Sequence, residues 1–108
     1  MKLEETKDFL KKEQQLIDLK VVMSSPEGRR FVWRMLGDAG VFRPSFVAGS
    51  ADITFFNEGS RNFGLILLTE IMAELPESFL IMQREAVNYE QSNKKEVQRN
   101  SGESDIDN

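Results

Sequence analysis

Residues 55–68 have the sequence FFNEGSRNFGLILL, in which a polar segment separates two phenylalanines from the most apolar run of the chain. Asn57 is a residue type that caps the amino termini of helices, and the acidic residue after it favours the positive end of the helix dipole. We therefore predict a helix over residues 58–74, and its apolar part, 63–68, makes it the central helix. Gly64 inside this helix costs about 1 kcal/mol relative to alanine, which indicates close approach by another segment.

The amino-terminal part of the chain predicts a long amphipathic helix over residues 3–23. Apolar residues recur at intervals of seven on two adjoining helical positions, with Lys, Glu and Gln between them. They are Leu3, Leu10 and Ile17 on one position, and Phe9, Leu16 and Met23 on the other. We favour packing of this helix on its own domain, with an intermolecular coiled coil as the alternative.

A second helix is predicted over residues 26–38. Ser24 and Ser25 are capping residues, and the proline that follows them fits the first turn of a helix. The helix should end at Gly37 or Gly40. Its predicted buried face consists of Phe31, Val32, Met35 and Leu36, with Trp33 at the border.

The segment over residues 41–56 is too irregular for a long helix and too apolar for a free linker, because it combines Pro44 and Gly49 with several phenylalanines. We predict an ordered, packed loop with at most a short turn of helix. Its anchors would be Phe42, Phe46, Phe55 and Phe56.

A fourth helix is predicted over residues 77–91, after the break at Pro76. Residues 92–108 carry too few apolar side chains to hold a core, so we predict a polar, mobile tail in which the helix reaches Arg99 at most. The predicted fold class is all-α. A small bundle of about four helices forms one domain over residues 1–91, with an aromatic-rich ordered loop and a polar carboxyl-terminal tail.

The 108-residue chain has a net charge of −4 and contains no Cys and no His. These absences exclude thiolate nucleophiles, Ser-His-Asp triads, disulfides and the usual zinc sites. The carboxylates nearest to apolar segments are expected to be caps or solvated groups rather than an enclosed acid–base pair; they are Asp52, Glu58, Glu70 and Glu74. We therefore predict no catalytic residue, no metal site, no cofactor and no enzymatic activity. No stretch approaches the roughly 20 apolar residues that span a bilayer.

Candidate partner-binding residues lie in the arginine-rich middle of the chain. They are Arg29, Arg30, Arg34, Arg43 and Arg61, together with Asn62, Phe42 and Phe46. Guanidinium groups offer a planar fork to carboxylates and phosphates. The alternative is a solvated helix face, paired internally with Glu27 and Asp38. Nucleic-acid binding would need several of these arginines on one face, because phosphate affinity comes from clustered cations.

Three segments occur in the order found in a family of short phage proteins: PEGRRFVWRML at 26–36, GVFR at 40–43 and FNEGSRNFGL at 56–65. Over roughly residues 18–90 the chain resembles small proteins of podovirus-like tailed bacteriophages, typified by a Bordetella phage protein. The resemblance implies a virion-associated or assembly-related role, because members of the family look like products of the virion-structure region of phage genomes. It carries over no catalytic residue.

The leading hypothesis is a non-enzymatic phage protein that contacts itself, as a homo-oligomer, or other virion proteins. It would be located in the virion and, during assembly, in the host cytoplasm. One form of the hypothesis places the protein inside the head and ejects it with the genome. Two alternatives stay open: a non-virion phage protein that binds and modulates a host factor, and a nucleic-acid-binding module.

Overall fold

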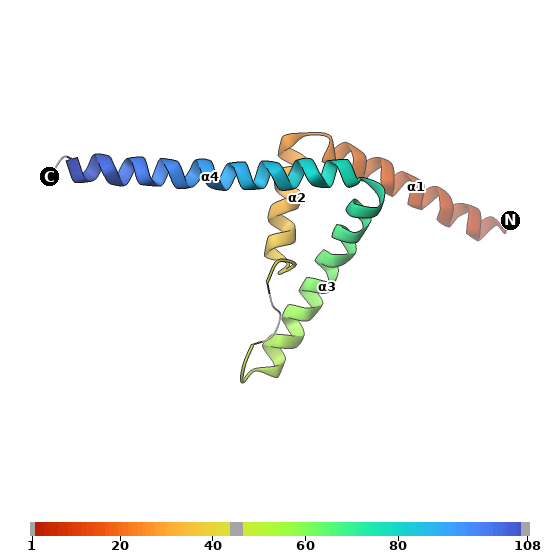
Figure 1. Ribbon diagram of the computed structural model, residues 1–108. Coiled ribbons are helices and arrows are strands. Elements are labelled where there is room, and N and C mark those ends of the chain that lie inside the picture. Colours follow the sequence, from red (N-terminus) through yellow and green to blue (C-terminus); the bar gives the residue numbers. More distant parts are fainter. Residues whose placement is uncertain (1, 44–46, 107–108) are drawn as a thin grey trace.

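The structure, a computed structural model, describes residues 2–43 and 47–106. In these ranges it contains four helices and no strand (Figure 1). The helices are α1 (Leu3–Met23), α2 (Pro26–Asp38), α3 (Ala51–Glu74) and α4 (Pro76–Ile106). The all-α prediction is confirmed, and α1 and α2 have the predicted bounds.

The bundle is open rather than spherical. From the junction of the helices, α1 and α4 extend in opposite directions, and α2 and α3 run away from both of them (Figure 1). The protein measures 75 × 41 × 16 Å, and its radius of gyration is 19.5 Å, whereas a compact domain of this length has a radius of about 13 Å. Much of each long helix therefore has no neighbour among the described residues.

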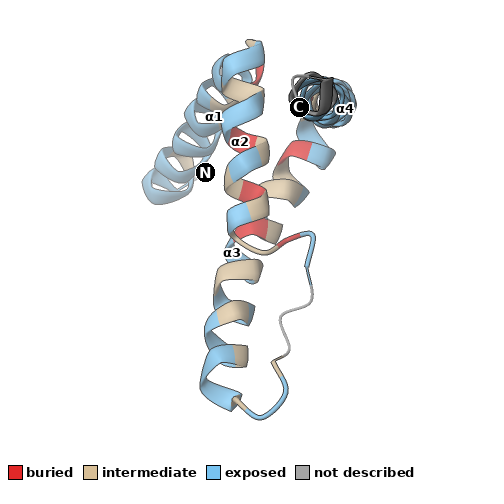
Figure 2. Ribbon diagram, turned by 90° about the vertical axis from the view of Figure 1, so that its left-hand side faces the viewer, coloured by how far each residue is buried: buried red, intermediate tan, exposed pale blue. Residues whose placement is uncertain are grey.

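The core lies where the four helices meet, and Figure 2 shows its buried residues along α2 and on the parts of the chain beside it. Leu36 of α2 and Ile71 of α3 are fully buried. Val32 and Leu36 confirm part of the predicted buried face of α2, but Phe31 of that face is about half exposed. The buried apolar residues of the described part are Met23, Val32, Leu36, Val41, Ile71 and Met82.

A tight corner joins α1 to α2. Ser25 caps α2, because its Oγ accepts a hydrogen bond from the N–H of Gly28 at 3.0 Å, and Pro26 occupies the first helical turn. The two helices come so close that a Cβ added to Gly28 would overlap the backbone carbonyl of Val22. Glycine at position 28 therefore permits the crossing that brings Met23 into the core.

Helix α3 begins earlier than predicted, and the predicted cap at Asn57 is wrong. The N-cap is Ser50, whose Oγ accepts from the N–H of Ile53 at 3.3 Å. Thr54 strengthens this start, because its Oγ1 accepts from the N–H of Val47 at 2.9 Å and donates to the carbonyl of Ser50 at 2.9 Å. Residues 55–64 are consequently helical throughout.

Gly64 is a close-packing position, as predicted. A Cβ added there would lie 2.5 Å from Val41 Cγ2 and 2.9 Å from Ala39 Cβ. These two residues follow α2, where Gly40 at φ +86° lets the chain leave the helix and turn back towards α3. The absence of a side chain at Gly64 thus allows the end of α2 to rest on α3.

Helix α4 begins at Pro76, continues beyond the predicted end at residue 91 and passes Arg99, the furthest residue expected to be helical. Residues 77–101 contain neither glycine nor proline, so nothing in this polar sequence stops the helix. An ion pair between Glu96 and Arg99, at 3.6 Å, adds local support. Within the described ranges, no helix is long and apolar enough to cross a membrane.

Candidate interaction surface

Exposed aromatic side chains gather on the side of α3 that faces away from the core. Positions 56, 59, 63 and 66 have the three- and four-residue spacing of a single helix face, and position 55 borders them. Phe55, Phe56, Phe63 and Ile66 are 73, 76, 74 and 68 % exposed, respectively. The predicted packed-loop anchors Phe55 and Phe56 are therefore solvent-exposed helix residues. We call Phe55, Phe56, Gly59, Phe63 and Ile66 the α3 outer face.

Gly59 lies in the middle of this face. No contact within the described part of the chain explains why this position is a glycine. Its backbone is helical, and an added Cβ would meet no atom within 4 Å. Glycine within a helix costs about 1 kcal/mol relative to alanine, and at Gly64 the contact with Val41 explains that cost. At Gly59 the missing side chain instead leaves a gap in the row of side chains, which we call the notch, between Phe55 and Phe63, the residues one turn before and after it.

The α3 outer face continues into an apolar groove between α1 and α3. The groove has a volume of about 460 Å³. Its residues are Gln15, Asp18, Leu19 and Val22 of α1, and Phe63, Ile66, Leu67 and Glu70 of α3. Because Phe63 and Ile66 belong to both features, the outer face and the groove form one apolar surface that spans two helices.

The apolar residues of α1 lie on two different surfaces of the helix. Leu19 and Met23 pack into or against the core, so α1 packs on its own domain through its carboxyl-terminal end. The column of apolar residues that runs from Leu3 to Val21 lies on a second, solvent-exposed surface of α1. Each of its residues is more than half exposed. These residues are Leu3, Leu10, Ile17 and Val21.

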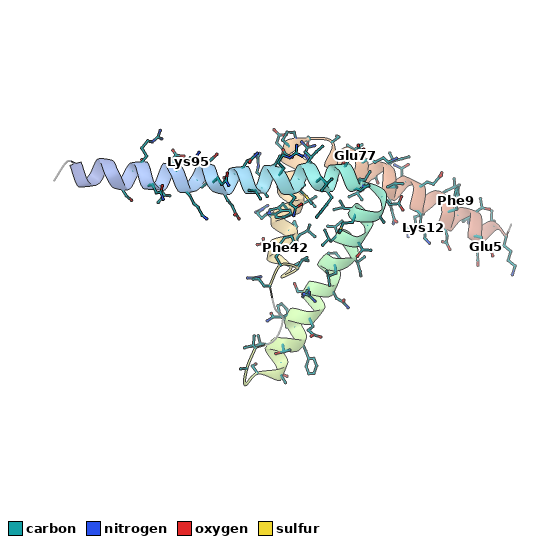
Figure 3. The ribbon with its side chains drawn as sticks, in the orientation of Figure 1. Glu5, Phe9, Lys12, Phe42, Glu77 and Lys95 are labelled. Carbon is teal, nitrogen blue, oxygen red and sulfur yellow. The ribbon has the colours of Figure 1, made fainter. Side chains whose placement is uncertain are left out.

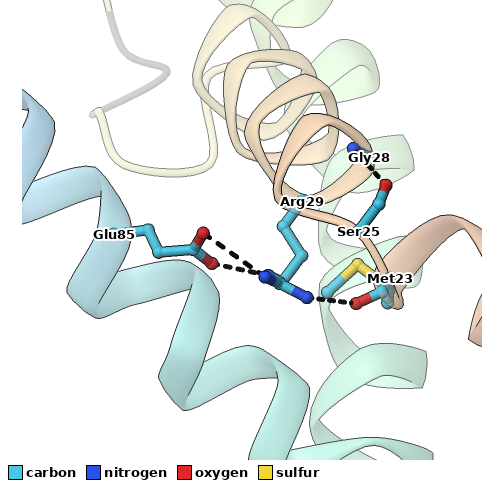
Figure 4. Close-up of polar contacts among 5 residues, drawn as sticks. All are labelled: Met23, Ser25, Gly28, Arg29 and Glu85. Atoms are coloured by element: carbon cyan, nitrogen blue, oxygen red, sulfur yellow. Dashed lines mark hydrogen bonds and ion pairs between the residues drawn. The ribbon is translucent and has the colours of Figure 1, made fainter.

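Arg29 holds α2 to α4 and α1 (Figure 4). Its Nε lies 2.5 Å from Glu85 Oε1, its Nη2 lies 3.4 Å from Oε2, and its Nη1 donates to the carbonyl of Met23 at 2.9 Å. The side chain is only 13 % exposed. Arg29 is therefore engaged inside the fold, and its partner is Glu85 of α4 rather than Glu27 or Asp38 of its own helix.

The other predicted arginines are spread over several surfaces. Arg30 lines an open hollow of about 510 Å³ between α2 and α4, and Arg34 lies over the ring of Phe31 at 5.5 Å. Arg43 donates to the carbonyl of Gly37 at 3.3 Å. In the described part of the chain, the five arginines are thus not brought together as one phosphate-binding patch.

Arg61 and Asn62 lie beside the α3 outer face. They line a shallow hollow together with Phe55, Glu58 and Gly59. The Nε of Arg61 is buried without a hydrogen-bond partner among the described residues. Of the predicted site residues, these two therefore lie nearest to the exposed aromatic surface.

The two remaining predicted site residues belong to the segment after α2. Phe42 is half exposed and stacks on Trp33, with ring centroids 4.7 Å apart and an angle of 29° between the rings. Figure 3 shows Phe42 beside α2, far from Phe9 on the outlying part of α1. Phe46 lies outside the described residues.

Residues 19–84 match a family model described as Bbp19-like phage protein. The chain belongs to this family. No curated protein and no solved structure matches it. The matched residues include all the buried core residues, from Met23 to Met82, and the whole α3 outer face. In this Bbp19-like protein, the first part of α1 and most of α4 lie outside the match.

Sequence reasoning misses the α3 outer face of the Bbp19-like protein because it takes Asn57 as a helix start. That choice places Phe55 and Phe56 in the preceding loop. The signal that could have found the face is the spacing of Phe56, Phe63 and Ile66 around Gly59, which continues across Asn57 without a break.

The substitution Glu85→Gln should lower the free energy of unfolding of the Bbp19-like protein by about 1–2 kcal/mol, because the poorly exposed Arg29 loses its ionic partner. Urea denaturation followed by circular dichroism measures the change. The matched control is Glu96→Gln, since the Glu96–Arg99 pair is well exposed and its loss should lower the free energy of unfolding by only about 0.3 kcal/mol. Equal effects of the two substitutions would show that the Arg29–Glu85 pair is no more than a surface contact.

Proposed function

We propose that this Bbp19-like protein is a non-enzymatic virion-associated or assembly protein of a podovirus-like tailed phage, acting through protein–protein contacts. The observation that carries the proposal is the α3 outer face, where three phenylalanines are each about three-quarters exposed. Large contiguous apolar patches on soluble proteins mark interaction sites. Membership of a phage protein family supports a phage partner.

The chemistry of the surface supports binding rather than catalysis. The α3 outer face consists of hydrocarbon side chains and a glycine, and it offers no nucleophile and no acid–base group. Its aromatic side chains instead provide contact area at a small cost in conformational entropy. In the finer form of the proposal, the protein is packaged in the head and leaves with the genome.

Mass spectrometry of gradient-purified phage particles tests the proposal. We expect peptides of this protein in a constant ratio to the major virion proteins across the particle peak. Its consistent absence from particles, while it is present in infected cells, would overturn the virion-associated form. Comparison of particles before and after triggered genome ejection then tests whether the protein leaves with the genome.

A phage carrying Phe63→Lys links the particle experiment to the α3 outer face. We expect this substitution to reduce incorporation at least tenfold, because a charge replaces an apolar contact. The matched control is Val97→Lys, an exposed apolar position on α4 outside the family match. Normal incorporation of both variants would remove the α3 outer face from the proposal.

A further inference from the structure

We infer that the α3 outer face is a homodimer interface. Helix α3 of one copy crosses α3 of a second copy in antiparallel orientation, and each Phe63 enters the notch at Gly59 of the other copy. The inference rests on the proposed function only in treating the α3 outer face as a protein contact surface.

The area of the surface is close to what a specific dimer needs. A phenylalanine side chain contributes 150–250 Å² when it is buried, so the outer face presents roughly 550 Å² per copy at the exposures found here. Pairing two such faces removes about 1,100 Å² from water, which approaches the 1,200–2,000 Å² of specific interfaces. The adjoining groove, lined by Val22 and Leu67, is the nearest further apolar surface that the second copy could cover.

The order of residues along α3 makes the face complementary to itself. If a two-fold axis crosses the outer face at the level of residue 61, Gly59 lies opposite Phe63 of the second copy, and Phe56 lies opposite Ile66. Each notch is then filled by a ring. A parallel pair would instead place Gly59 on Gly59 and Phe63 on Phe63, which leaves both notches empty, so the antiparallel pair packs better.

A steep crossing keeps apart the like charges at the two ends of the face. The row Phe55–Gly59–Phe63 has four-residue spacing, and ridges of this kind cross at about 50° when they interdigitate. Asp52 and Glu70 each lie nine residues, about 14 Å along the helix, from the crossing point. At this angle Asp52 and Glu70 of the second copy diverge into solvent, where a Debye length of about 10 Å screens their repulsion.

Substitution of Gly59 tests the notch without harming the fold. By sedimentation equilibrium of the full chain, we expect the wild type to be dimeric and Gly59→Ala to dimerise at least tenfold more weakly, because its methyl group occupies the space of the Phe63 ring. The matched control is Gly37→Ala, another helical position where an added Cβ meets nothing within 4 Å. It should dimerise like the wild type, because Gly37 lies on α2, outside the interface.

Three further variants test the contact made by Phe63 and the orientation of the two copies. Phe63→Lys should be monomeric and still helical by circular dichroism, since this side chain is three-quarters exposed within one copy. The chain has no cysteine, so Phe56→Cys and Ile66→Cys can be mixed and oxidised. Antiparallel crossing predicts that mixed disulfides form in preference to Phe56→Cys homodimers.

Several outcomes would overturn the inference: a monomeric wild type, a dimer that tolerates both Gly59→Ala and Phe63→Lys, or preferential formation of the Phe56→Cys homodimer. A monomer that incorporates into particles would assign the α3 outer face to another virion protein, so the inference fails and the proposed function stands. If the protein is a dimer but is absent from particles, the inference stands and the virion-associated form of the proposed function fails. The solution and particle experiments therefore fail independently.

Discussion

Gly28→Ala should destabilise the protein by about 3 kcal/mol, at the upper end of the cost of overpacking. The added methyl group would overlap the carbonyl of Val22, which is backbone and cannot move away as a flexible side chain can. Relief requires α1 to shift relative to α2. That shift would draw Met23 out of the core and disturb the Met23 carbonyl that accepts from Arg29.

Urea and thermal denaturation of Gly28→Ala, followed by helical circular dichroism, measure this loss. Gly37→Ala provides the matched control, because an added Cβ there has open space. It should gain about 0.5–1 kcal/mol from the better helix propensity of alanine. Similar stability of the two variants would show that α1 and α2 do not cross as closely as described here.

The corner between α1 and α2 could be predicted to the residue because its signals are local. The Ser-Pro pair at 25–26 acts through bonds within one turn, and its effect does not depend on the rest of the fold. Gly64 could be predicted as a contact position for a related reason. A glycine in an apolar helix carries a cost that packing must explain, although the sequence does not name Val41 as the neighbour.

The start of α3 and the role of Arg29 could not be predicted in the same way. Asn57 and Ser50 are both good caps, and the choice between them depends on the bonds that Thr54 makes with Ser50 and Val47. The partner of Arg29, Glu85, is distant in sequence, and local spacing rules give only neighbours on the same helix. Both errors concern polar groups with several acceptable partners.

The open shape explains why the sequence pattern does not distinguish core residues from surface residues on α3. Aromatic residues in a small domain are usually assigned to its core. Here, however, the helices diverge, and the part of α3 that carries Phe55 and Phe56 extends beyond the region where the core residues meet (Figure 2). A sequence shows that a face is apolar, but not whether the chain itself covers it.

The small size of this core makes Leu36→Ala the other substitution with a large expected effect. Leu36 is fully buried, and in the described part of the chain only a few buried residues share the core with it. Truncation of a buried leucine to alanine costs about 2–5 kcal/mol, depending on how far the cavity collapses. We expect about 3 kcal/mol, because the neighbours Ile71 and Met82 lie on different helices and cannot close the cavity together without moving both.

Leu10→Ala is the control for Leu36→Ala, because it makes the same chemical change on the exposed column of α1. It should alter the free energy of unfolding by less than about 0.5 kcal/mol, as surface substitutions do. The pair of measurements also separates the two apolar surfaces of the protein. If Leu10→Ala destabilised the protein as much as Leu36→Ala, and only at concentrations where the protein self-associates, α1 would be buried in an oligomer and the α3 outer face would not be the only contact between copies.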